Sequence, residues 1–314
     1  MISLGIIGAG IMGRRMLGAA TEQAADVVRI AGIWDPSPAA LTDLVGIPKP
    51  GTAAALIAAS DCVYIASPPA SHLTHAAAAL AAGKAVFCEK PLAVDTAAAE
   101  AFVASAAGAR AAVNFPMASS LGVAKLREWL AANTIGTATR LDIAVEFATW
   151  PRGWQRDAAK WLDAPAEGGF TREVVSHFLF LTRRLCGPLH LLAGRAAFPE
   201  PGRSERKLEA RLEAGGIPVA LHGRVGGTEA DDHNLWTLTG TKGSIRLRDW
   251  SIAERLVGDT WQPDPGAMPN ARMRPLVLRR QLEGVALMTA NAAHHLATLA
   301  EALEVQQTVE SMLR

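Results

Sequence analysis

Cysteine is scarce in this sequence, and its few copies lie too far apart to form a recognisable site. The 314 residues include three, Cys62, Cys88 and Cys186, with no C-x-x-C pair among them. Three cysteines cannot all pair within one chain, so we expect reduced thiols and a cytoplasmic protein.

An excess of charge of one sign and long apolar runs are also lacking. The formal net charge is +1, and without a basic cluster there is no electrostatic argument for a nucleic-acid partner. No apolar run approaches the roughly 20 residues that span a membrane. The first residues, MISLGIIGAG, lack the charged region and cleavage site of a signal peptide. We therefore expect a small-molecule partner, and neither nucleic acid nor a membrane.

The first third of the chain has short apolar runs that alternate with alanine-rich helical segments. Five runs have the character of buried parallel strands: Ile2–Ile7, Val27–Trp34, Asp61–Ala66, Ala85–Cys88 and Ala111–Phe115. Strands that alternate with helices predict an α/β Rossmann domain with a doubly wound parallel sheet. A chain of this length is expected to form two domains, here residues 1–117 and residues 118–314.

A glycine motif stands between the first strand and the helix that follows it. Gly8, Gly10 and Gly13 form G-x-G-x-x-G, with Ile11 and Met12 at the start of the helix. The first glycine permits a tight turn, the second lets the backbone approach a pyrophosphate, and the third allows close packing of helix on strand. Free N–H groups at the helix start favour the phosphates. The motif predicts a dinucleotide site, with a purely structural turn as the alternative.

Asp35 bears on which dinucleotide binds. It ends the second strand, 22 positions after Gly13, where a carboxylate can accept hydrogen bonds from the adenine ribose hydroxyls. Its charge would repel a 2′-phosphate, which favours NAD over NADP. Arg14 and Arg15 follow the motif and could pair with such a phosphate, but an exposed first helical turn is the simpler interpretation.

Two later segments resemble one family in particular. They are SPPASH, residues 67–72, and AGKAVFCEKPLAVD, residues 82–95. They resemble the glucose–fructose oxidoreductase / inositol dehydrogenase (Gfo/Idh/MocA) family, in which one strand ends in a proline turn before a histidine and a later strand ends in Glu-Lys-Pro. The resemblance implies a second, α+β domain with a large, mostly antiparallel open sheet that joins a homodimer or homotetramer. It also implies oxidation of a sugar or polyol hydroxyl, or the reverse reduction.

The resemblance assigns roles to residues of these two segments. Ser67, Pro68, His72 and Glu89 would lie beside the cofactor, and Lys90 would contact the substrate. Because Lys90 follows a predicted parallel strand, it stands where open α/β sheets bind their ligands, and an ammonium there can assist proton transfer. The alternatives are a surface lysine at position 90, a structural ion pair for Glu89 and a helix-start role for His72.

The pattern changes after residue 117. A helix is expected over residues 121–132 and a half-buried strand over residues 138–148. Shorter strands are expected at residues 207–212, 219–225, 235–239 and 244–247. The tetrapeptide GTKG, residues 240–243, predicts a hairpin turn. Residues 259–275 are expected to form a long loop, and residues 292–314 resemble the closing helix of the family.

The stretch GGFTREVVSH, residues 168–177, places Glu173 and His177 four positions apart, on one face of a helix. Alone, this pair could bind a metal, act as an acid and a base, or form a solvated face. Two ligands without a third at linked spacing argue against a metal, and we expect none. In the family that the chain resembles, a G-G-x-x-x-D-x-x-x-H pattern brings an aspartate and a histidine to the nicotinamide. His177 is thus a candidate acid/base and substrate contact, while Glu173 departs from the pattern and could be catalytic, support Lys90 or be structural.

Further substrate contacts are predicted on either side of this helix. Aromatic and cationic residues alternate in one segment: Trp150, Arg152, Trp154, Arg156, Lys160 and Trp161. Aromatics can stack on sugar faces and arginines can hold a carboxylate or phosphate; the alternative is a loop whose tryptophans pack between domains. Trp154 and Arg172 are predicted substrate contacts. Asn114 is a third, although the Arg or Tyr that many relatives carry soon after it is missing.

The leading hypothesis is an NAD-dependent dehydrogenase or reductase. A hydride would pass between nicotinamide and a hydroxyl- or carbonyl-bearing carbon of a sugar, polyol or sugar acid. Lys90 would polarise or protonate the oxygen, His177 would act as acid/base, and Glu173 would orient one of them. Two alternatives stay open: an enzyme for a non-sugar carbonyl or imine, and an NAD-binding sensor or scaffold without turnover.

Overall fold

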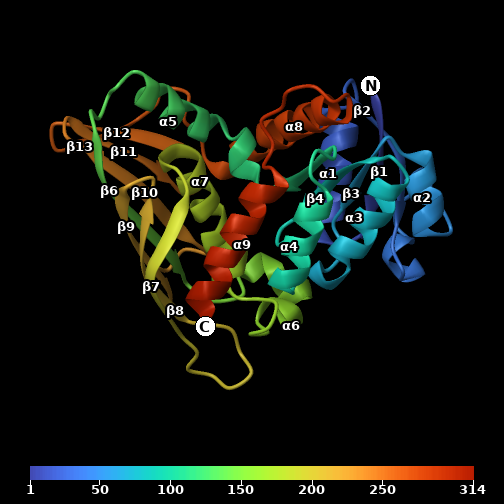
Figure 1. Cartoon of the computed structure of the whole chain (residues 1–314), viewed down its shortest axis with the longest axis horizontal. Helices are drawn as coiled ribbons and strands as arrows, with labels where there is room; N and C mark the ends of the chain where they lie inside the picture. The colour runs from blue at the N-terminus through green and yellow to red at the C-terminus, as the bar shows by residue number, and fades with distance from the viewer. The chain divides into compact units, whose positions relative to one another are not determined.

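The computed structural model describes residues 1–314, with side chains at every position except 156–158. The chain forms two compact units, one of residues 1–119 and 274–303, the other of residues 120–273 and 304–314. Each unit is built on its own sheet (Figure 1). The return of residues 274–303 to the first unit is not part of the sequence-based division at residue 117.

The first unit has a parallel sheet with the strand order β2-β1-β3-β4-β5. Its strands are β1 Ile2–Ile7, β2 Val28–Trp34, β3 Cys62–Ile65, β4 Ala85–Glu89 and β5 Ala111–Asn114. The helices between them are α1 Ile11–Gly18, α2 Ala53–Ala59, α3 His72–Ala81 and α4 Thr96–Ser105. Every residue of β3 and β4 is buried, which explains their unbroken apolar sequence. The predicted doubly wound sheet is confirmed.

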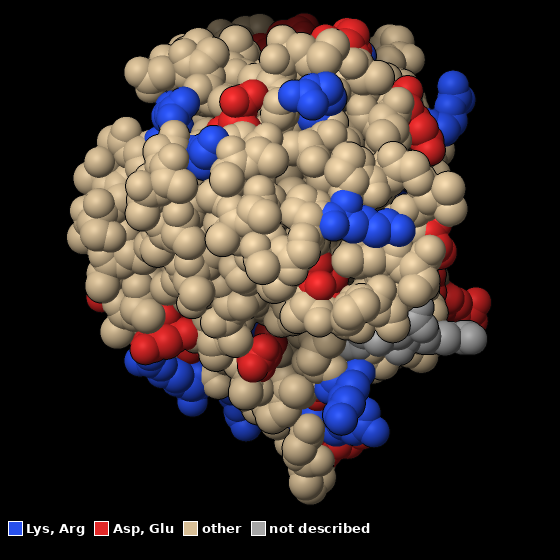
Figure 2. Space-filling view, turned by 90° about the vertical axis from the view of Figure 1, so that its right-hand side faces the viewer, with Lys and Arg blue, Asp and Glu red and all other residues tan. Residues whose placement is uncertain are grey.

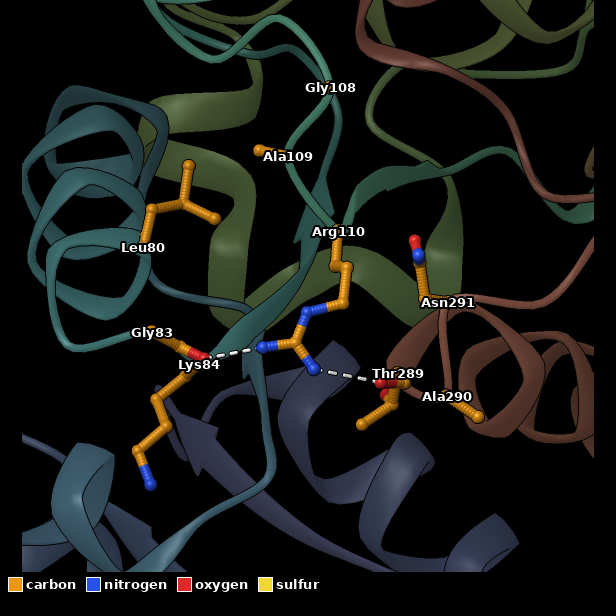
Figure 3. Close-up of a pocket in the computed structure, with 9 residues that line it drawn as sticks. All are labelled: Leu80, Gly83, Lys84, Gly108, Ala109, Arg110, Thr289, Ala290 and Asn291. Atoms are coloured by element: carbon orange, nitrogen blue, oxygen red, sulfur yellow. Dashed lines mark hydrogen bonds between the residues drawn. The ribbon is translucent and has the colours of Figure 1, made fainter.

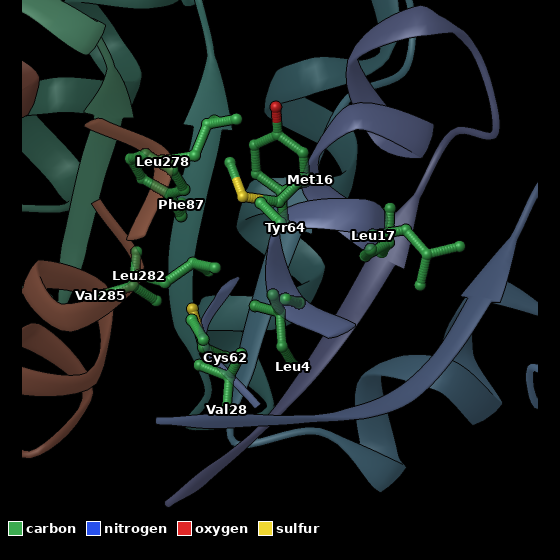
Figure 4. Packing of buried hydrophobic residues seen from close by; sticks show 14 of the residues in the cluster. Leu4, Met16, Leu17, Val28, Cys62, Tyr64, Phe87, Leu278, Leu282 and Val285 are labelled. Atoms are coloured by element: carbon green, nitrogen blue, oxygen red, sulfur yellow. The ribbon is translucent and has the colours of Figure 1, made fainter. Parts of the chain in front are cut away.

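Helix α8, Asn270–Thr289, completes the core of the first unit. Its residues Leu278, Leu282 and Val285 share one buried cluster with Phe87 of β4 and Cys62 of β3 (Figure 4). Burying three large aliphatic side chains stabilises the unit by several kcal/mol, at about 2 kcal/mol each. This packing is why the chain returns to the first unit after forming the second.

The second unit has an eight-stranded sheet with the order β13-β12-β11-β10-β6-β9-β8-β7. Its strands are β6 Ala138–Phe147, β7 Leu189–Ala197, β8 Lys207–Ala214, β9 Ile217–Val225, β10 His233–Gly240, β11 Gly243–Arg248, β12 Ile252–Val257 and β13 Thr260–Pro263. Only the β6–β9 pair is parallel, so the predicted α+β class with a mostly antiparallel sheet is confirmed. The predicted hairpin turn is also found, because Gly240 pairs with Gly243.

Helices of the second unit include α5 Leu121–Ala131, α6 Ala159–Leu162 and α7 Ser176–Cys186, and α9 Leu299–Leu313 ends in it. Two expectations for the C-terminal region are wrong. Residues 259–275 are not one long loop, because they contain β13 and the start of α8, and residues 292–298 are not helical. Proline and glycine suggested a loop, yet Pro275 is accommodated inside α8. The helix is stabilised because its apolar residues pack into the core of the first unit.

Charged side chains of both signs are scattered over the face shown in Figure 2, in keeping with a net charge of +1. Among the helices that the structure describes, none combines the length and the apolar character of a membrane span.

Candidate functional site

The strand order of the first unit defines a crevice at the carboxyl ends of β1 and β3. The order reverses between these two strands, and open α/β sheets bind ligands at such a point. Gly8 directly follows β1, and its N–H donates to the Trp34 carbonyl at the end of β2, 2.8 Å away. Ser67 and Pro68 lie just beyond the end of β3. The structure therefore brings the glycine turn and the proline turn to one end of the sheet.

The three glycines of the first turn have different surroundings. Gly8 has a φ of +101°, and a Cβ there would lie 2.6 Å from the Ala66 carbonyl oxygen. A Cβ on Gly13 would overlap the Gly8 carbonyl oxygen, whereas one on Gly10 would meet no atom within 4 Å. Protein packing thus requires glycine at 8 and 13 but not at 10. The space at Gly10, together with the start of α1 at Ile11 and Met12, fits the pyrophosphate of a dinucleotide.

Asp35 is fixed beside this turn by two backbone hydrogen bonds. Its Oδ2 accepts from the Ala9 N–H at 2.9 Å, and its Oδ1 accepts from the Ser37 N–H at 2.8 Å. Each carboxylate oxygen keeps a lone pair for a ribose hydroxyl. Arg14 donates to both carboxylate oxygens of Asp43, at 2.8 and 2.9 Å. That bidentate pair supports the structural interpretation of Arg14 over a role in binding a 2′-phosphate.

His72 connects the two turns that follow β3 and β4. It is 1% exposed, and burial lowers its pKa. Its Nδ1 lies 2.8 Å from the Pro91 carbonyl oxygen, and its Nε2 lies 2.8 Å from that of Ser67. These contacts support the structural role considered for His72, and its contact with a cofactor stays a prediction. The Ser67 hydroxyl shares a hydrogen bond with that of Ser71.

A buried polar network fixes the end of β4, directly before Lys90. The hydroxyl of Tyr64 donates to Glu89, and the Asn114 amide donates to the same carboxylate oxygen at 2.7 Å. The Gln281 amide of α8 in turn donates to the Asn114 side-chain oxygen. Burial, together with the neighbouring Glu89 carboxylate, raises the pKa of Tyr64 well above its usual value. Strands β3, β4 and β5 and helix α8 are thereby tied together where Lys90 begins the next turn.

This network bears on two predicted contacts, those of Glu89 and Asn114. The side chains of both residues are bonded inside the unit, so the structure shows them as supports of the Lys90 turn. Their contacts with cofactor and substrate stay predictions. Sequence reasoning missed Tyr64 and Gln281; the one available signal was that Tyr64 is the only tyrosine in the chain.

In the second unit, Glu173 and His177 lie on one continuous helical segment. A π-helical turn, Thr171–Val175, leads directly into α7. Such turns are rare and are frequent at functional sites. Glu173 is half-buried and His177 is 8% exposed. Among the side chains that the structure describes, no group of three or more His, Cys, Asp and Glu residues could hold a metal ion.

The two glycines before this helix are required by packing. A Cβ on Gly168 would overlap the Leu162 carbonyl group. Gly169 has a φ of +101°, and a Cβ there would collide with the Glu205 carboxylate. That carboxylate is fully buried, and its Oε1 accepts from the Thr171 N–H at 2.7 Å, which caps the start of the helix. Burial raises the pKa of Glu205. Sequence reasoning did not identify this residue, because the loop that carries it has no signal tied to the helix.

Arg172 is held inside the second unit. Its Nε and Nη2 donate to the two carboxylate oxygens of Glu310, at 2.6 and 2.8 Å. Its Nη1 donates to the carbonyls of Pro165 and Gly168. The guanidinium therefore ties the helix start to α9, and its contact with a substrate stays a prediction.

The aromatic segment before the helix is divided between core and surface. Trp150 is 6% exposed, packs against Phe147 and Phe170, and belongs to the core. Trp154 is 47% exposed and keeps the character of a rim residue. Arg152 donates to Asp232 at 2.6 Å and lies over the Trp154 ring. The Arg156 side chain lies outside the described ones.

A pocket in the first unit lies away from these turns (Figure 3). Its volume is about 520 Å³, and its lining includes Lys84 and Arg110, which immediately precede β4 and β5. It is therefore at the amino edge of the sheet. Arg110 donates to the carbonyls of Gly83 and Thr289 at 2.5 and 2.8 Å. Its guanidinium therefore connects the segment that follows α3 to the end of α8. Parallel sheets bind ligands at the other edge.

Comparisons with known proteins agree with this arrangement. Residues 2–115 match the family model GFO_IDH_MocA, described as "Oxidoreductase family, NAD-binding Rossmann fold". An inositol 2-dehydrogenase 3 from Saccharopolyspora erythraea is 33% identical over 143 residues, 43% of this chain and 42% of that protein. An inositol 2-dehydrogenase from Cereibacter sphaeroides is 38% identical over 103 residues, 30% of this chain and 29% of that protein. The chain thus spans less than half the length of these curated relatives.

Solved structures extend the likeness of fold to the whole chain. An oxidoreductase from Thermotoga maritima has a TM-score of 0.84 at 18% identity, covering 100% of this chain and 96% of that one. An oxidoreductase from Agrobacterium radiobacter in complex with NAD+, L-tartaric acid and magnesium has a TM-score of 0.81 at 20% identity, covering 98% and 94%. At these identities the likeness shows the fold alone. Residues 2–115, which form most of the first unit, are therefore similar to the NAD-binding Rossmann domain of the Gfo/Idh/MocA oxidoreductases, and over the rest of the chain the likeness is one of fold.

Proposed function

We propose that the protein is an NAD-dependent dehydrogenase acting on a hydroxyl-bearing carbon of a polyol or sugar, or catalysing the reverse reduction. The observation that carries the proposal is the position of Lys90. It follows β4 at the same sheet edge as the glycine turn, on a backbone fixed by the buried Glu89 network. An ammonium group held at the cofactor edge of a Rossmann sheet suits proton transfer to or from a substrate oxygen.

The residues divide the chemistry between them. NAD, when bound, supplies the hydride acceptor or donor. Lys90 donates a hydrogen bond to the reacting oxygen and stabilises negative charge that develops on it. His177 accepts the hydroxyl proton during oxidation and returns it during reduction. Glu173, one turn before His177 on the same helical segment, orients His177.

Neutral polyols are the first substrates to examine. The matched relatives are inositol 2-dehydrogenases, and inositol is uncharged. Arg152 and Arg172, two of the three arginines expected to hold a substrate anion, are each paired with a carboxylate, Asp232 and Glu310. An acidic substrate would have to compete with those pairs.

Turnover on matched substrates tests the proposal. We expect NADH formation with myo-inositol or another neutral polyol or sugar, and less with sugar acids such as glucuronate. Lys90→Ala should lower kcat by at least about 100-fold. Lys84→Ala is the matched control, because Lys84 stands at the amino end of the same strand, and should leave kcat unchanged. Full turnover by Lys90→Ala would refute the mechanism; NADH binding without turnover of any substrate would favour a sensor or scaffold.

Asp35 gives a separate test of cofactor choice. The wild type should bind NADH more tightly than NADPH, because the carboxylate at the end of β2 repels a 2′-phosphate. Asp35→Ser should reduce that preference while leaving Arg14 paired with Asp43. Equal affinity of the wild type for the two cofactors would overturn the assignment of NAD.

Self-association through the second sheet is proposed from the charges of β8. Its exposed residues alternate in sign: Lys207, Glu209, Arg211 and Glu213. In two copies related by a two-fold axis at residue 210, each exposed residue would face an opposite charge. Glu209→Lys should therefore lower the mass measured by light scattering, and adding Arg211→Glu should restore it. A mass unchanged by the first substitution would contradict this interface.

A further inference from the structure

Trp250 occupies a backbone position that disfavours a tryptophan. It lies in the three-residue turn between β11 and β12, which is closed by the paired residues Arg248 and Ile252. Asp249 and Trp250 have φ values of +46° and +74°. Asparagine, aspartate and above all glycine suit such angles, whereas a bulky side chain there is a genuine outlier. Hairpin formation alone therefore does not explain a tryptophan at position 250.

The ring of Trp250 lies against His177. The two ring centroids are 5.4 Å apart, with an interplanar angle of 72°, an edge-to-face arrangement. Phe178, the next residue of α7, contacts the same indole at 5.3 Å. Edge-to-face packing restricts the orientations open to an imidazole, and a fixed orientation is what proton transfer requires.

The indole is also held by the carboxylate of a charged pair. Its Nε1–H donates to Asp232 Oδ2 at 3.2 Å, and the same oxygen accepts from Arg152 Nη1 at 2.6 Å. Arg152 is itself held by Gln155 and stacks on Trp154. A continuous set of contacts therefore runs from the aromatic segment through Asp232 and Trp250 to His177. All of its members belong to the second unit.

We infer that Trp250 is a positioning residue for His177, with Asp232 as its anchor. The left-handed backbone at Trp250 is retained because the indole in that place orients the imidazole. The inference rests on the proposed role of His177 as acid/base. It adds two residues, Trp250 and Asp232, that no sequence motif indicates, and it links the aromatic segment to the reacting group.

Three variants separate the ring, its anchor and a merely structural role. Trp250→Gly removes the ring and relieves the backbone, and should lower kcat at least tenfold with KM for NAD+ unchanged. Trp250→Phe keeps an aromatic ring and should recover most of the lost kcat. Trp261→Leu, on β13 of the same sheet, is the matched control and should change neither value. If Trp250→Gly retains kcat within twofold, or if Trp250→Phe recovers none of the loss, the inference is overturned.

A measurement on the imidazole keeps this test independent of substrate. The His177 Cε1–H signal is identified in the NMR spectrum by its loss in His177→Gln. Its chemical shift is then followed against pH, and the midpoint of that titration is determined. Trp250→Gly should move both the chemical shift and the midpoint, and Asp232→Ala, which releases the indole, should move them less. If neither variant moves them, the inference fails even where turnover is found. If they move but no substrate reacts, the contact stands and the proposed function fails. Should Trp250→Gly not fold, Asp232→Ala decides.

Discussion

The two glycine clusters of this protein look alike in sequence but have different surroundings. In the turn after β1, Gly10 has no protein atom within 4 Å of where a Cβ would lie. At the start of the second-unit helix, both Gly168 and Gly169 are closed in by the protein itself. The first cluster therefore leaves space for a ligand at Gly10, whereas both glycines of the second are required by the fold.

This difference separates a glycine that leaves room for the cofactor from glycines that the packing of the protein requires. Gly8 and Gly13 resemble Gly168 and Gly169, because a Cβ on any of the four would collide with neighbouring atoms. Gly10 alone among these five has no packing reason to be glycine. Substituting Gly10 should therefore affect cofactor binding and spare stability, whereas substituting any of the other four should lower stability.

Gly13→Ala should have the largest effect on stability. Its Cβ would overlap the Gly8 carbonyl oxygen, which is backbone and cannot rotate away. We expect a loss of about 3 kcal/mol in the free energy of unfolding, measured by urea denaturation. Gly46→Ala is unsuitable as a control because Gly46 has a φ of +74°, so Gly51→Ala, where a Cβ meets nothing, serves instead. A stable Gly13→Ala protein would show that the turn is looser than described.

Gly169→Ala should come next, with a loss of about 2 kcal/mol from the positive φ and the collision with Glu205. Combining it with Glu205→Ala should cost less than the sum of the two single changes, because the collision then disappears. NADH affinity should stay within twofold of the wild type. Simple additivity of the two substitutions would mean that they do not share a contact.

Glu205→Gln should show a smaller, pH-dependent effect. Because the folded state raises the pKa of Glu205, the protonated form is favoured on folding, and the stability it contributes is lost as the pH rises above about 4. The wild type should therefore lose stability relative to Glu205→Gln between pH 4 and pH 7. Urea midpoints at several pH values measure this, with Glu229→Gln, at an exposed position, as control. A gap that is constant with pH would be the contrary result.

Local patterns made much of the first unit predictable. Residues Ile2–Ile7 were predicted as a strand and form β1 with the same bounds. A short apolar run that ends at a glycine turn is typical of a buried parallel strand. The G-x-G-x-x-G motif indicated the helix after Gly10, and the distance of 22 positions from Gly13 indicated Asp35 at the end of the second strand. Helix α8 was missed because its packing partners, such as Phe87, lie almost two hundred residues earlier in the chain. No local signal carries that information.

The candidate site was predictable only in part, for a similar reason. Lys90 and His177 stand out through short motifs, whereas their supports are contributed by distant segments. Gln281 reaches Asn114 from α8, and Glu205 reaches Thr171 from the loop between β7 and β8. These supporting residues meet their partners only in the folded structure, so no fixed spacing in the sequence identifies them.

Gly10→Ala tests the central claim most directly, because it changes a residue that the fold does not need. Gly10 has a φ of −75°, which alanine accepts, so the variant should be as stable as the wild type or gain about 0.5 kcal/mol. Its NADH affinity, measured by calorimetry, should fall at least about tenfold because the new methyl group occupies the space for the pyrophosphate. An unfolded Gly10→Ala protein, or one that binds NADH as the wild type does, would contradict the account.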